Sequence, residues 1–300
     1  MDLRELEQAL YAGTNGAAWT EQLARYFSSH ELFYGHGTAN PTDEAYWLVR
    51  ALQSWDEKAW LTSPDPALIP RLLEVAGQRV EQRKPLAYLL GEAWFAGLRF
   101  TIDERVLIPR SPLAELIEAG FEPWCELRSG DRLLDIGTGS GCLAIAAAHH
   151  CPGIDVDATE VSPAALAVAA ANIRAFALEE RVTLHAADLF PSQRARYRVI
   201  VANPPYVPEP RLDELPPEYG YEPRIGLNGG PVGLEVVARI LRQAPAYLAS
   251  DGVLIIEVGE AQPAFATAYS QLPVTWLDFE HGGDGVALIT CDELTGHSAS

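Results

Sequence analysis

Hydrophobic residues recur every three or four positions through the first part of the chain, as they do along the buried face of a helix. The repeats fall around residues 3–11, 23–27, 46–55 and 68–80. The run Asn40-Pro41-Thr42-Asp43-Glu44 has the order of a helix start: a capping side chain, proline at the first helical position, then acids in the first turn. The pattern predicts four or five short helices packed as one domain over residues 1–84.

The pattern changes at residue 85. Aromatic and β-branched residues surround Gly97 between positions 94 and 102, which predicts a β-hairpin, and we expect residues 85–112 to form a hinge. Beyond it, short apolar strands alternate with helical stretches. The predicted strands are 132–136, 155–160, 182–185, 199–202, 253–258, 275–279 and 286–290. This order predicts an α/β domain over 113–291 with a mostly parallel, doubly wound sheet, followed by a flexible tail over 292–300.

Composition narrows the class of protein. The 300 residues are 48% hydrophobic and 21% charged, typical of a globular protein of about two domains. No apolar run approaches the roughly 18 residues that span a membrane, and the acidic start is not a signal peptide. The four scattered cysteines predict neither a disulfide framework nor a zinc site. We therefore expect a cytoplasmic protein without a metal.

The net charge of −19 is unevenly distributed. Residues 1–88 hold 12 acids and 8 bases, a net of −4, whereas residues 89–300 hold 29 acids and 14 bases, a net of −15. Binding to nucleic-acid phosphates requires a broad basic face. Direct sequence-specific binding of nucleic acid is therefore not expected.

A glycine-rich loop follows the first strand of the α/β domain, at the sheet edge where such folds bind ligands. Its sequence is Asp135-Ile136-Gly137-Thr138-Gly139-Ser140-Gly141. A dinucleotide fingerprint would need its third glycine at position 142, which is a cysteine. An acid followed by Gly-x-Gly-x-Gly is more typical of a site for S-adenosyl-L-methionine, whose cationic methionine end suits a carboxylate. A loop that only connects strand to helix is the plainer alternative.

Two more acids follow the next strands. Glu160 ends the second strand, where a carboxylate can accept both ribose hydroxyls. Asp188 and Leu189 follow the third, where the acid can accept the adenine amino group and the leucine can pack on the ring. Each acid alone is better explained as a solvated loop residue, but acids at three successive strand ends favour a cofactor site.

The most specific motif, Asn203-Pro204-Pro205-Tyr206, directly follows the fourth strand. Prolines stiffen the backbone and leave its carbonyls as acceptors. The side-chain carbonyl of Asn203 and the carbonyl of Pro204 can accept the two hydrogens of a planar amino group, and Tyr206 can pack against it. Two such bonds raise the electron density on a poorly nucleophilic nitrogen and aim it at a methyl group. We expect these four residues to be catalytic, with Asn203 also beside the cofactor; a proline-rich turn is the alternative.

Residues 85–291 resemble the protein glutamine methyltransferases, which methylate the side-chain amide nitrogen of a glutamine. The glycine loop, Glu160, the motif at 203–206 and the segment Leu107-Ile108-Pro109-Arg110-Ser111-Pro112 carry the resemblance. It implies a class I SAM-dependent methyltransferase fold, Rossmann-like, with a mostly parallel seven-stranded sheet and a C-terminal antiparallel hairpin. It also implies that the helical domain recognises the substrate. Adenine amino-methyltransferases share the Asn-Pro-Pro-Tyr motif, so the motif indicates the chemistry and not the substrate.

Three segments resemble one branch of this family, which acts on the large-subunit ribosomal protein L-three. They are Tyr34-Gly35-His36-Gly37-Thr38 with Asn40-Pro41, then Arg110-Ser111-Pro112, and Gly282-Gly283-Asp284-Gly285-Val286. The release-factor branch usually has Pro-Arg-Pro-Asp-Thr-Glu where this chain has residues 109–115. The resemblance thus implies a basic ribosomal protein as substrate. A release-factor enzyme, a nucleic-acid adenine methyltransferase and a non-catalytic cofactor-binding scaffold remain as alternatives.

The segment 207–231, next to the predicted catalytic loop, holds five acids and two arginines. It is either an ordinary solvated loop or a surface that helps to hold a cationic protein near the active site by electrostatic steering.

Overall fold

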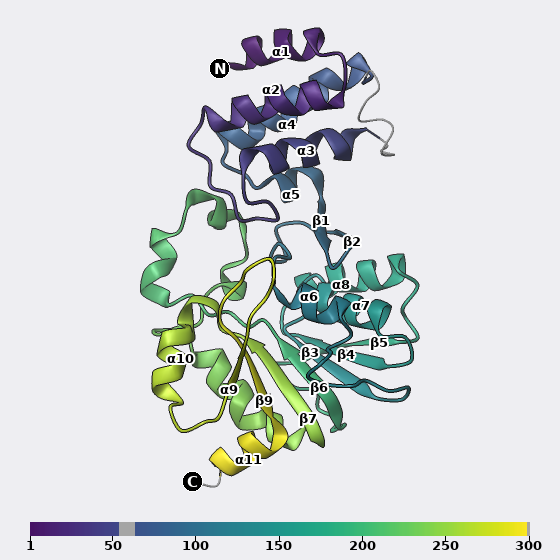
Figure 1. The fold of residues 1–300 in the computed structure, drawn as a ribbon, viewed down its shortest axis with the longest axis vertical. Helices are drawn as coiled ribbons and strands as arrows, with labels where there is room; N and C mark the ends of the chain where they lie inside the picture. The colour runs from purple at the N-terminus through teal and green to yellow at the C-terminus, as the bar shows by residue number, and fades with distance from the viewer. Residues whose placement is uncertain (54–63, 299–300) are drawn as a thin grey trace. The chain divides into compact units, whose positions relative to one another are not determined.

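The structure, a computed structural model, describes residues 1–53 and 64–298, so the end of the predicted 46–55 repeat lies outside it. The chain divides into two compact units. The first comprises Met1–Ala93 with Pro216–Tyr221, and the second comprises Trp94–Leu215 and Glu222–Ser300. The division falls within β1 (Glu92–Phe95), which pairs with β2 (Leu98–Thr101) in the predicted hairpin (Figure 1).

Helices make up the described part of the first unit. They are α1 (Leu3–Ala12), α2 (Gly16–Ser28), α3 (Pro41–Leu52), the short 3-10 turn Pro66–Leu68, α4 (Ile69–Glu81), α5 (Leu86–Leu90) and the 3-10 segment Pro217–Tyr221. Asn40 Oδ1 accepts the backbone N–H groups of Thr42 and Asp43 at 3.0 Å each, with Pro41 as the first helical residue, which confirms the predicted start of α3. The apolar faces form a core that includes Leu10, Trp19, Leu23, Phe27 and Leu48.

A buried ionic cluster ties the excursion at 216–221 into the first unit. The carboxylate of Glu218 accepts from Arg83 Nε at 2.8 Å, from Arg79 Nη1 at 3.2 Å and from the Phe33 N–H at 2.9 Å. Arg79 Nε also donates to Glu44 at 2.5 Å. Because an unpaired buried charge is costly, these partners make the position of Glu218 in the unit specific.

The second unit is built on a seven-stranded sheet with the order β5-β4-β3-β6-β7-β9-β8. Its strands are β3 (Arg132–Ile136), β4 (Asp155–Glu160), β5 (Val182–Ala186), β6 (Tyr197–Ala202), β7 (Leu248–Glu257), β8 (Thr275–Leu277) and β9 (Val286–Thr290). The first five are parallel, and β9 runs antiparallel to β7 and β8. The predicted fold class is confirmed, with β6 and β7 starting earlier than predicted.

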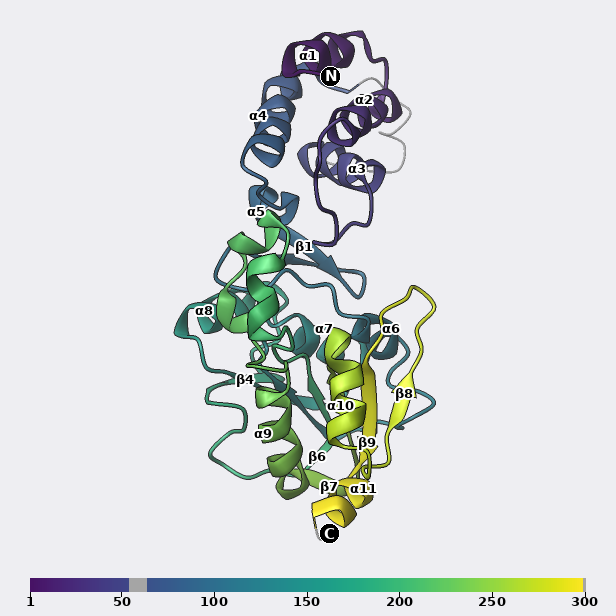
Figure 2. The same ribbon diagram turned by 90° about the vertical axis from the view of Figure 1, so that its left-hand side faces the viewer.

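Helices cover both faces of this sheet. They are α6 (Leu113–Glu118), α7 (Cys142–His150), α8 (Pro163–Ala175), α9 (Glu235–Gln243), α10 (Gln262–Ala268) and α11 (Cys291–Ser298). Leu134 and Ile136 of β3 belong to the core with α9 and α10, which lie side by side in Figures 1 and 2. Asp135, between them, bonds instead to the first turn of α7. Since successive residues of a strand face opposite sides, α7 covers the other face.

The predicted flexible tail is wrong, because residues 291–298 form α11. Thr290 Oγ1 accepts the Glu293 N–H at 3.3 Å, and Glu293 Oε2 accepts the Thr290 N–H at 2.7 Å, the reciprocal arrangement of a capping box. Leu294 is 2% exposed in the core under the sheet. The sequence Thr290-Cys291-Asp292-Glu293 carried this start signal.

Candidate active site

A cavity of about 470 Å³ lies in the second unit at the carboxyl ends of β3, β4, β5 and β6. The strand order reverses between β3 and β6, where parallel α/β sheets form their ligand crevice. Its size is within the range of about 300–1,000 Å³ that is usual for small-molecule sites. The predicted site residues that line it are Gly137, Thr138, Gly139, Ser140, Glu160, Asp188, Leu189, Asn203, Pro204 and Pro205. Three others, Asp135, Gly141 and Tyr206, are not among the described lining residues.

The glycine loop leaves room on its cavity side. Gly137 and Gly139 have φ of +73° and +55°, and a Cβ added to either would meet no atom within 4 Å. A ligand can therefore approach this backbone closely. Gly141 differs, because its Cβ would come within 3.2 Å of Ile145 and 3.4 Å of Ala169. Its small size serves the packing of α7 against α8 and not the cavity.

Asp135 holds the glycine loop in place through buried hydrogen bonds. It is fully buried, and its Oδ2 accepts from Thr138 Oγ1 at 2.5 Å and from the Ala144 N–H at 3.1 Å. Burial raises the pKa of Asp135 to about 7, although the two hydrogen bonds by themselves would lower it. The side chain therefore holds the loop to α7, whereas the sequence placed it among the cofactor contacts.

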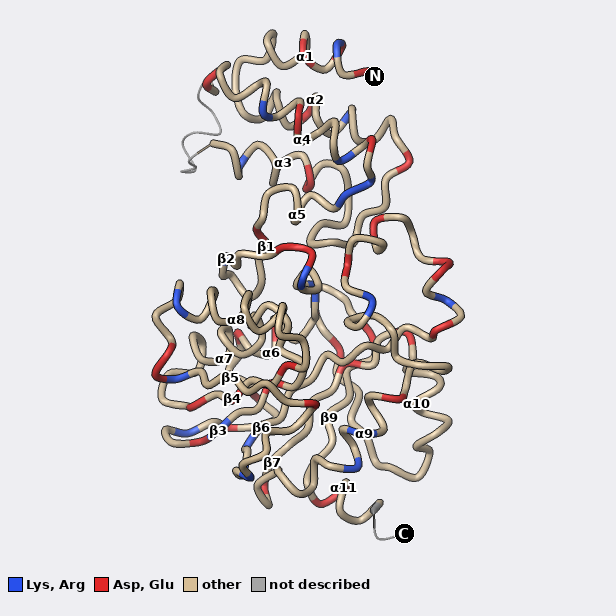
Figure 3. The backbone as a smooth tube through the Cα atoms, turned by 180° about the vertical axis from the view of Figure 1, so that it is seen from behind, with Lys and Arg blue, Asp and Glu red and all other residues tan. Residues whose placement is uncertain are grey.

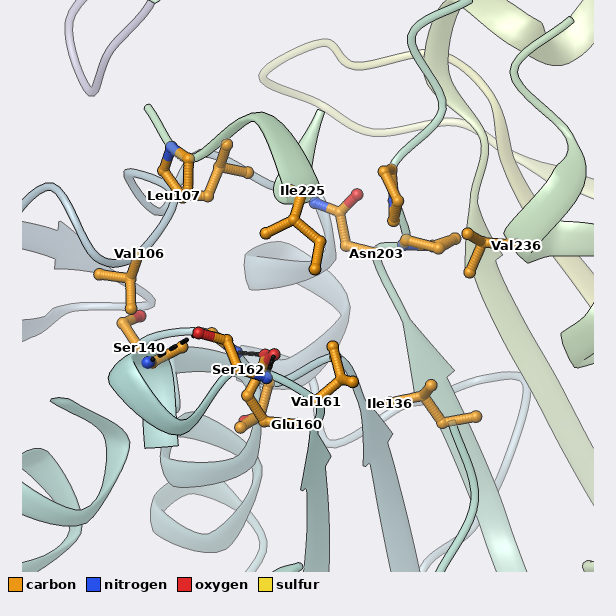
Figure 4. Close-up of a pocket in the computed structure, with 18 of the residues that line it drawn as sticks. Val106, Leu107, Ile136, Ser140, Glu160, Val161, Ser162, Asn203, Ile225 and Val236 are labelled. Atoms are coloured by element: carbon orange, nitrogen blue, oxygen red, sulfur yellow. Dashed lines mark hydrogen bonds between the residues drawn. The ribbon is translucent and has the colours of Figure 1, made fainter. Parts of the chain in front are cut away.

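The acids after β4 and β5 differ in how firmly they are held. Glu160 is 9% exposed, and its carboxylate accepts the Gly139 N–H at 3.0 Å and the Ser162 N–H at 2.9 Å. Figure 4 shows Glu160 next to Ser162. Asp188 is exposed and pairs with Arg239 of α9 at 2.5 Å, a cation that also lines the cavity. Leu189 lies in the left-handed region at φ +72°, a strained backbone typical of ligand sites. Glu160 is the better-organised acceptor.

The loop after β6 presents three of its four residues to the cavity. Asn203, Pro204 and Pro205 line it, and Figure 4 shows the amide of Asn203 directed toward the cavity. Tyr206 instead packs on the sheet core and donates from its hydroxyl to Glu257 Oε1 at 3.1 Å. Its ring lies against Gly259, and packing of Tyr206 on the reacting group stays a prediction.

Two further segments form walls of the cavity, and the second lies within residues 207–231, which were expected near the active site. Residues 105–111 and 223–226 line the cavity, with Ile225 opposite Asn203 in Figure 4. Glu222 joins them, because it accepts the Ile108 N–H at 3.0 Å and the Arg110 guanidinium at 2.5 and 2.8 Å. Only the family resemblance pointed to the first of these segments, since long-range pairing between loops leaves no periodic signal.

The acidic segment 207–231 is less acidic at its surface than its sequence indicates. Glu218 and Glu222 are buried against arginines, as described above. Asp213 lies 3.5 Å from Arg224, and Arg211 bonds to Glu260 at 2.7 Å. Figure 3 shows acidic and basic positions interspersed along the backbone. Across residues 1–53 and 64–298, no group of His, Cys, Asp and Glu side chains is arranged to hold a metal. None of the described helices combines the length and hydropathy needed to cross a bilayer.

This chain is similar in sequence to a known family and to several characterised proteins, and more remotely similar to solved structures. A family model described as "Methyltransferase small domain" matches residues 124–213. The ribosomal protein uL3 glutamine methyltransferase of Xanthomonas campestris is 45% identical, covering 91% of this chain and 90% of that protein. Proteins of the same name from Xylella fastidiosa and Bordetella pertussis are 44% and 43% identical, covering 91% and 87% of this chain and 89% of each protein. Among solved structures, a methyltransferase from Pyrococcus furiosus is 21% identical with a TM-score of 0.46, covering 64% of this chain and 87% of that chain, a likeness too remote to bear on function.

Proposed function

Because the chain belongs to the family of ribosomal protein uL3 glutamine methyltransferases, we propose that it transfers a methyl group from S-adenosyl-L-methionine to the side-chain amide nitrogen of a glutamine in uL3, the large-subunit protein L-three. The proposed ribosomal substrate also supports a cytoplasmic location for the reaction. The net charge of −19 is compatible with a basic protein substrate.

The cavity residues fit the proposed cofactor. The open backbone at Gly137 and Gly139 can accommodate its methionine part, and Glu160 presents a fixed carboxylate for the ribose hydroxyls. Leu189 and Asp188 lie where the adenine is expected, with Asp188 shared by Arg239. When bound, the cofactor supplies an electrophilic methyl group on a sulfonium.

The acceptor nitrogen needs orientation more than deprotonation. Its lone pair is delocalised into the amide carbonyl, so it is a weak nucleophile. The Asn203 side-chain carbonyl and the Pro204 carbonyl are proposed to accept its two N–H groups and hold its lone pair in line with the methyl group. With the cofactor bound, this nitrogen would receive the methyl group from the sulfonium, and the nitrogen would then release a proton to water.

One observation carries the proposal: Asn203 and Pro204 line the same cavity as the glycine loop and Glu160. Methyl donor and acceptor amide can therefore meet within a single cavity, which is what an in-line transfer requires.

The test is to incubate the enzyme and labelled cofactor separately with purified uL3, a release factor and DNA. We expect label on uL3, at a glutamine side chain identified by mass spectrometry. Label on the release factor alone would reassign the substrate, and label on DNA would reassign the chemistry. Cofactor binding without transfer to any of the three would favour a non-catalytic scaffold.

A further inference from the structure

Glu257, the last residue of β7, is a buried carboxylate next to the catalytic loop. It is 5% exposed and does not line the cavity with the described residues. Its Oε1 accepts from the Tyr206 hydroxyl at 3.1 Å, and its Oε2 accepts from Ser111 Oγ at 2.5 Å. Burial raises the pKa of Glu257, while the hydrogen bonds from Ser111 and Tyr206 oppose the rise. Burying a carboxylate is costly unless it is hydrogen-bonded, so these two bonds determine where the Glu257 side chain can lie.

The ring of Tyr206 has little freedom around this bond. Gly259 has φ +44°, and a Cβ there would come within 2.6 Å of the ring. Behind the loop, a Cβ at Gly233 would come within 2.3 Å of the Tyr206 carbonyl, and one at Gly229 within 2.8 Å of the Pro205 carbonyl. Because these three positions outside the loop are glycines, the neighbouring backbone can pack directly against residues 205–206. The hydrogen bond to Glu257 then fixes the hydroxyl end of the Tyr206 side chain.

Glu257 joins this loop to a second segment that lines the cavity. Ser111, which lines the cavity, also accepts the Leu113 N–H with the same Oγ that donates to Glu257. The carboxylate therefore bridges two segments, at 111–113 and at 206. Because Pro204 and Pro205 stiffen the backbone between Asn203 and Tyr206, a shift of the tyrosine is transmitted to the asparagine.

We propose that Glu257 is a positioning residue: by holding the Tyr206 hydroxyl and Ser111, it sets where Asn203 and the Pro204 carbonyl present their acceptor oxygens. This inference rests on the proposed role of those two groups in orienting the amide. It assigns Tyr206 an anchoring role through its hydroxyl, distinct from packing on the substrate through its ring.

The test compares Tyr206→Phe, Glu257→Gln and the double variant in uL3 methylation. We expect Tyr206→Phe to lower kcat by about 10- to 100-fold with KM for uL3 changed by less than about threefold, because positioning acts on the reacting geometry. Glu257→Gln should lower kcat less, since its carboxamide oxygen still accepts from Tyr206. The double variant should be no worse than Tyr206→Phe, because the bond that Glu257→Gln weakens is already absent from Tyr206→Phe.

The chain offers a matched control. Tyr197 is 1% exposed and donates from its hydroxyl to the buried carboxylate of Asp157 at 2.8 Å, away from the cavity. Tyr197→Phe should lower the thermal midpoint as Tyr206→Phe does, yet leave kcat within about twofold of the wild type. An equal loss of kcat in both tyrosine variants, or effects of Tyr206→Phe and Glu257→Gln that multiply in the double variant, would overturn the proposal.

A second measurement separates this inference from the proposed function. The amides of Val207 and Gly229 are bonded to the carbonyls of Leu227 and Val207 at 2.9 Å each, next to Tyr206. Hydrogen exchange at these amides should accelerate about tenfold in Tyr206→Phe and remain unchanged in Tyr197→Phe. A wild-type enzyme that fails to methylate uL3 refutes the substrate, whereas unchanged exchange in Tyr206→Phe refutes the anchor.

Discussion

The loops after β3 and β6 begin at adjacent parallel strands, and they differ in where their critical glycines lie. In the loop after β3, Gly137 and Gly139 belong to the loop itself and leave open space beside the cavity. In the loop after β6, the loop is proline-rich, and the critical glycines, Gly229, Gly233 and Gly259, lie in the segments packed around it. The first loop makes room for a ligand, and the second is held in one position.

Each loop also has a buried carboxylate at its base, and the two carboxylates differ in what they hold. Asp135 accepts within its own loop and from the first turn of α7, which follows directly in sequence. Glu257 joins segments separated by 146 and 51 residues. A binding loop can be organised locally, whereas the proposed acceptor geometry depends on contacts from distant parts of the chain.

The most severe test of this contrast is Asn203→Ala. Removing the side-chain carbonyl leaves one acceptor for the substrate amide, and we expect kcat to fall by at least about 10³-fold. Affinity for the cofactor, measured by calorimetry, should change by less than about threefold, since the glycine loop and Glu160 are intact. Parallel losses of turnover and cofactor affinity would mean that the two loops do not divide the work in this way.

Asp135→Asn tests the base of the binding loop. The pKa of Asp135 is raised to about 7 in the folded protein from 3.8, so the fold favours the protonated carboxyl. The stability that this preference contributes is present below about pH 4 and is lost as the pH rises through about 7. Asparagine does not ionise, so the free energy of unfolding of the wild type should fall relative to that of the variant by up to about 4 kcal/mol over this range.

Urea unfolding from about pH 4 to about pH 8 measures this difference. A constant offset between wild type and Asp135→Asn would show that the carboxyl does not titrate with folding. Asp157→Asn is a useful control, because hydrogen bonds from His185, Tyr197 and Arg132 outweigh burial and lower the pKa of Asp157. Its contribution has the opposite sign and is lost as the pH falls below about 4, so it should change little between about pH 4 and about pH 8.

A pair of alanine substitutions sharpens the contrast directly. Gly259→Ala puts a Cβ within 2.6 Å of the Tyr206 ring, so it should lower kcat by about 10- to 100-fold and leave cofactor affinity nearly intact. Gly139→Ala puts its Cβ into open space beside the cavity, so it should weaken cofactor binding by about tenfold with a smaller effect on kcat. Both positions have positive φ, so the strain of an L-residue is common to the two variants. Identical kinetic profiles would contradict the distinction.

The difference between the loops also explains what the sequence could predict. The sheet, the glycine loop and Asn203 to Pro205 follow from strand periodicity and local motifs, so their positions at the carboxyl edge were predictable. Helix α11 was predictable from its capping box and was missed. The motifs did not predict that Gly141 and Asp135 are buried, or that the Tyr206 hydroxyl bonds to Glu257. These positions depend on residues from other segments that contact them in the fold, and a local motif carries no information about those residues.

The same reasoning changes the expected role of the acidic segment at 207–231, and its test has the smallest predicted effect. If all five acids faced solvent, they would attract a basic protein strongly, and kcat/KM would fall steeply with salt. Glu218 and Glu222 are instead buried against arginines, and Asp213 lies beside Arg224. The attraction that remains comes from the dispersed net charge and is screened over about 10 Å at 0.1 M salt.

We therefore expect kcat/KM for uL3 to fall only about two- to fivefold between about 0.05 and 0.3 M salt, with kcat unchanged. A much steeper fall would restore the segment as a steering surface, and a flat profile would show that complementary charge plays no part in substrate capture.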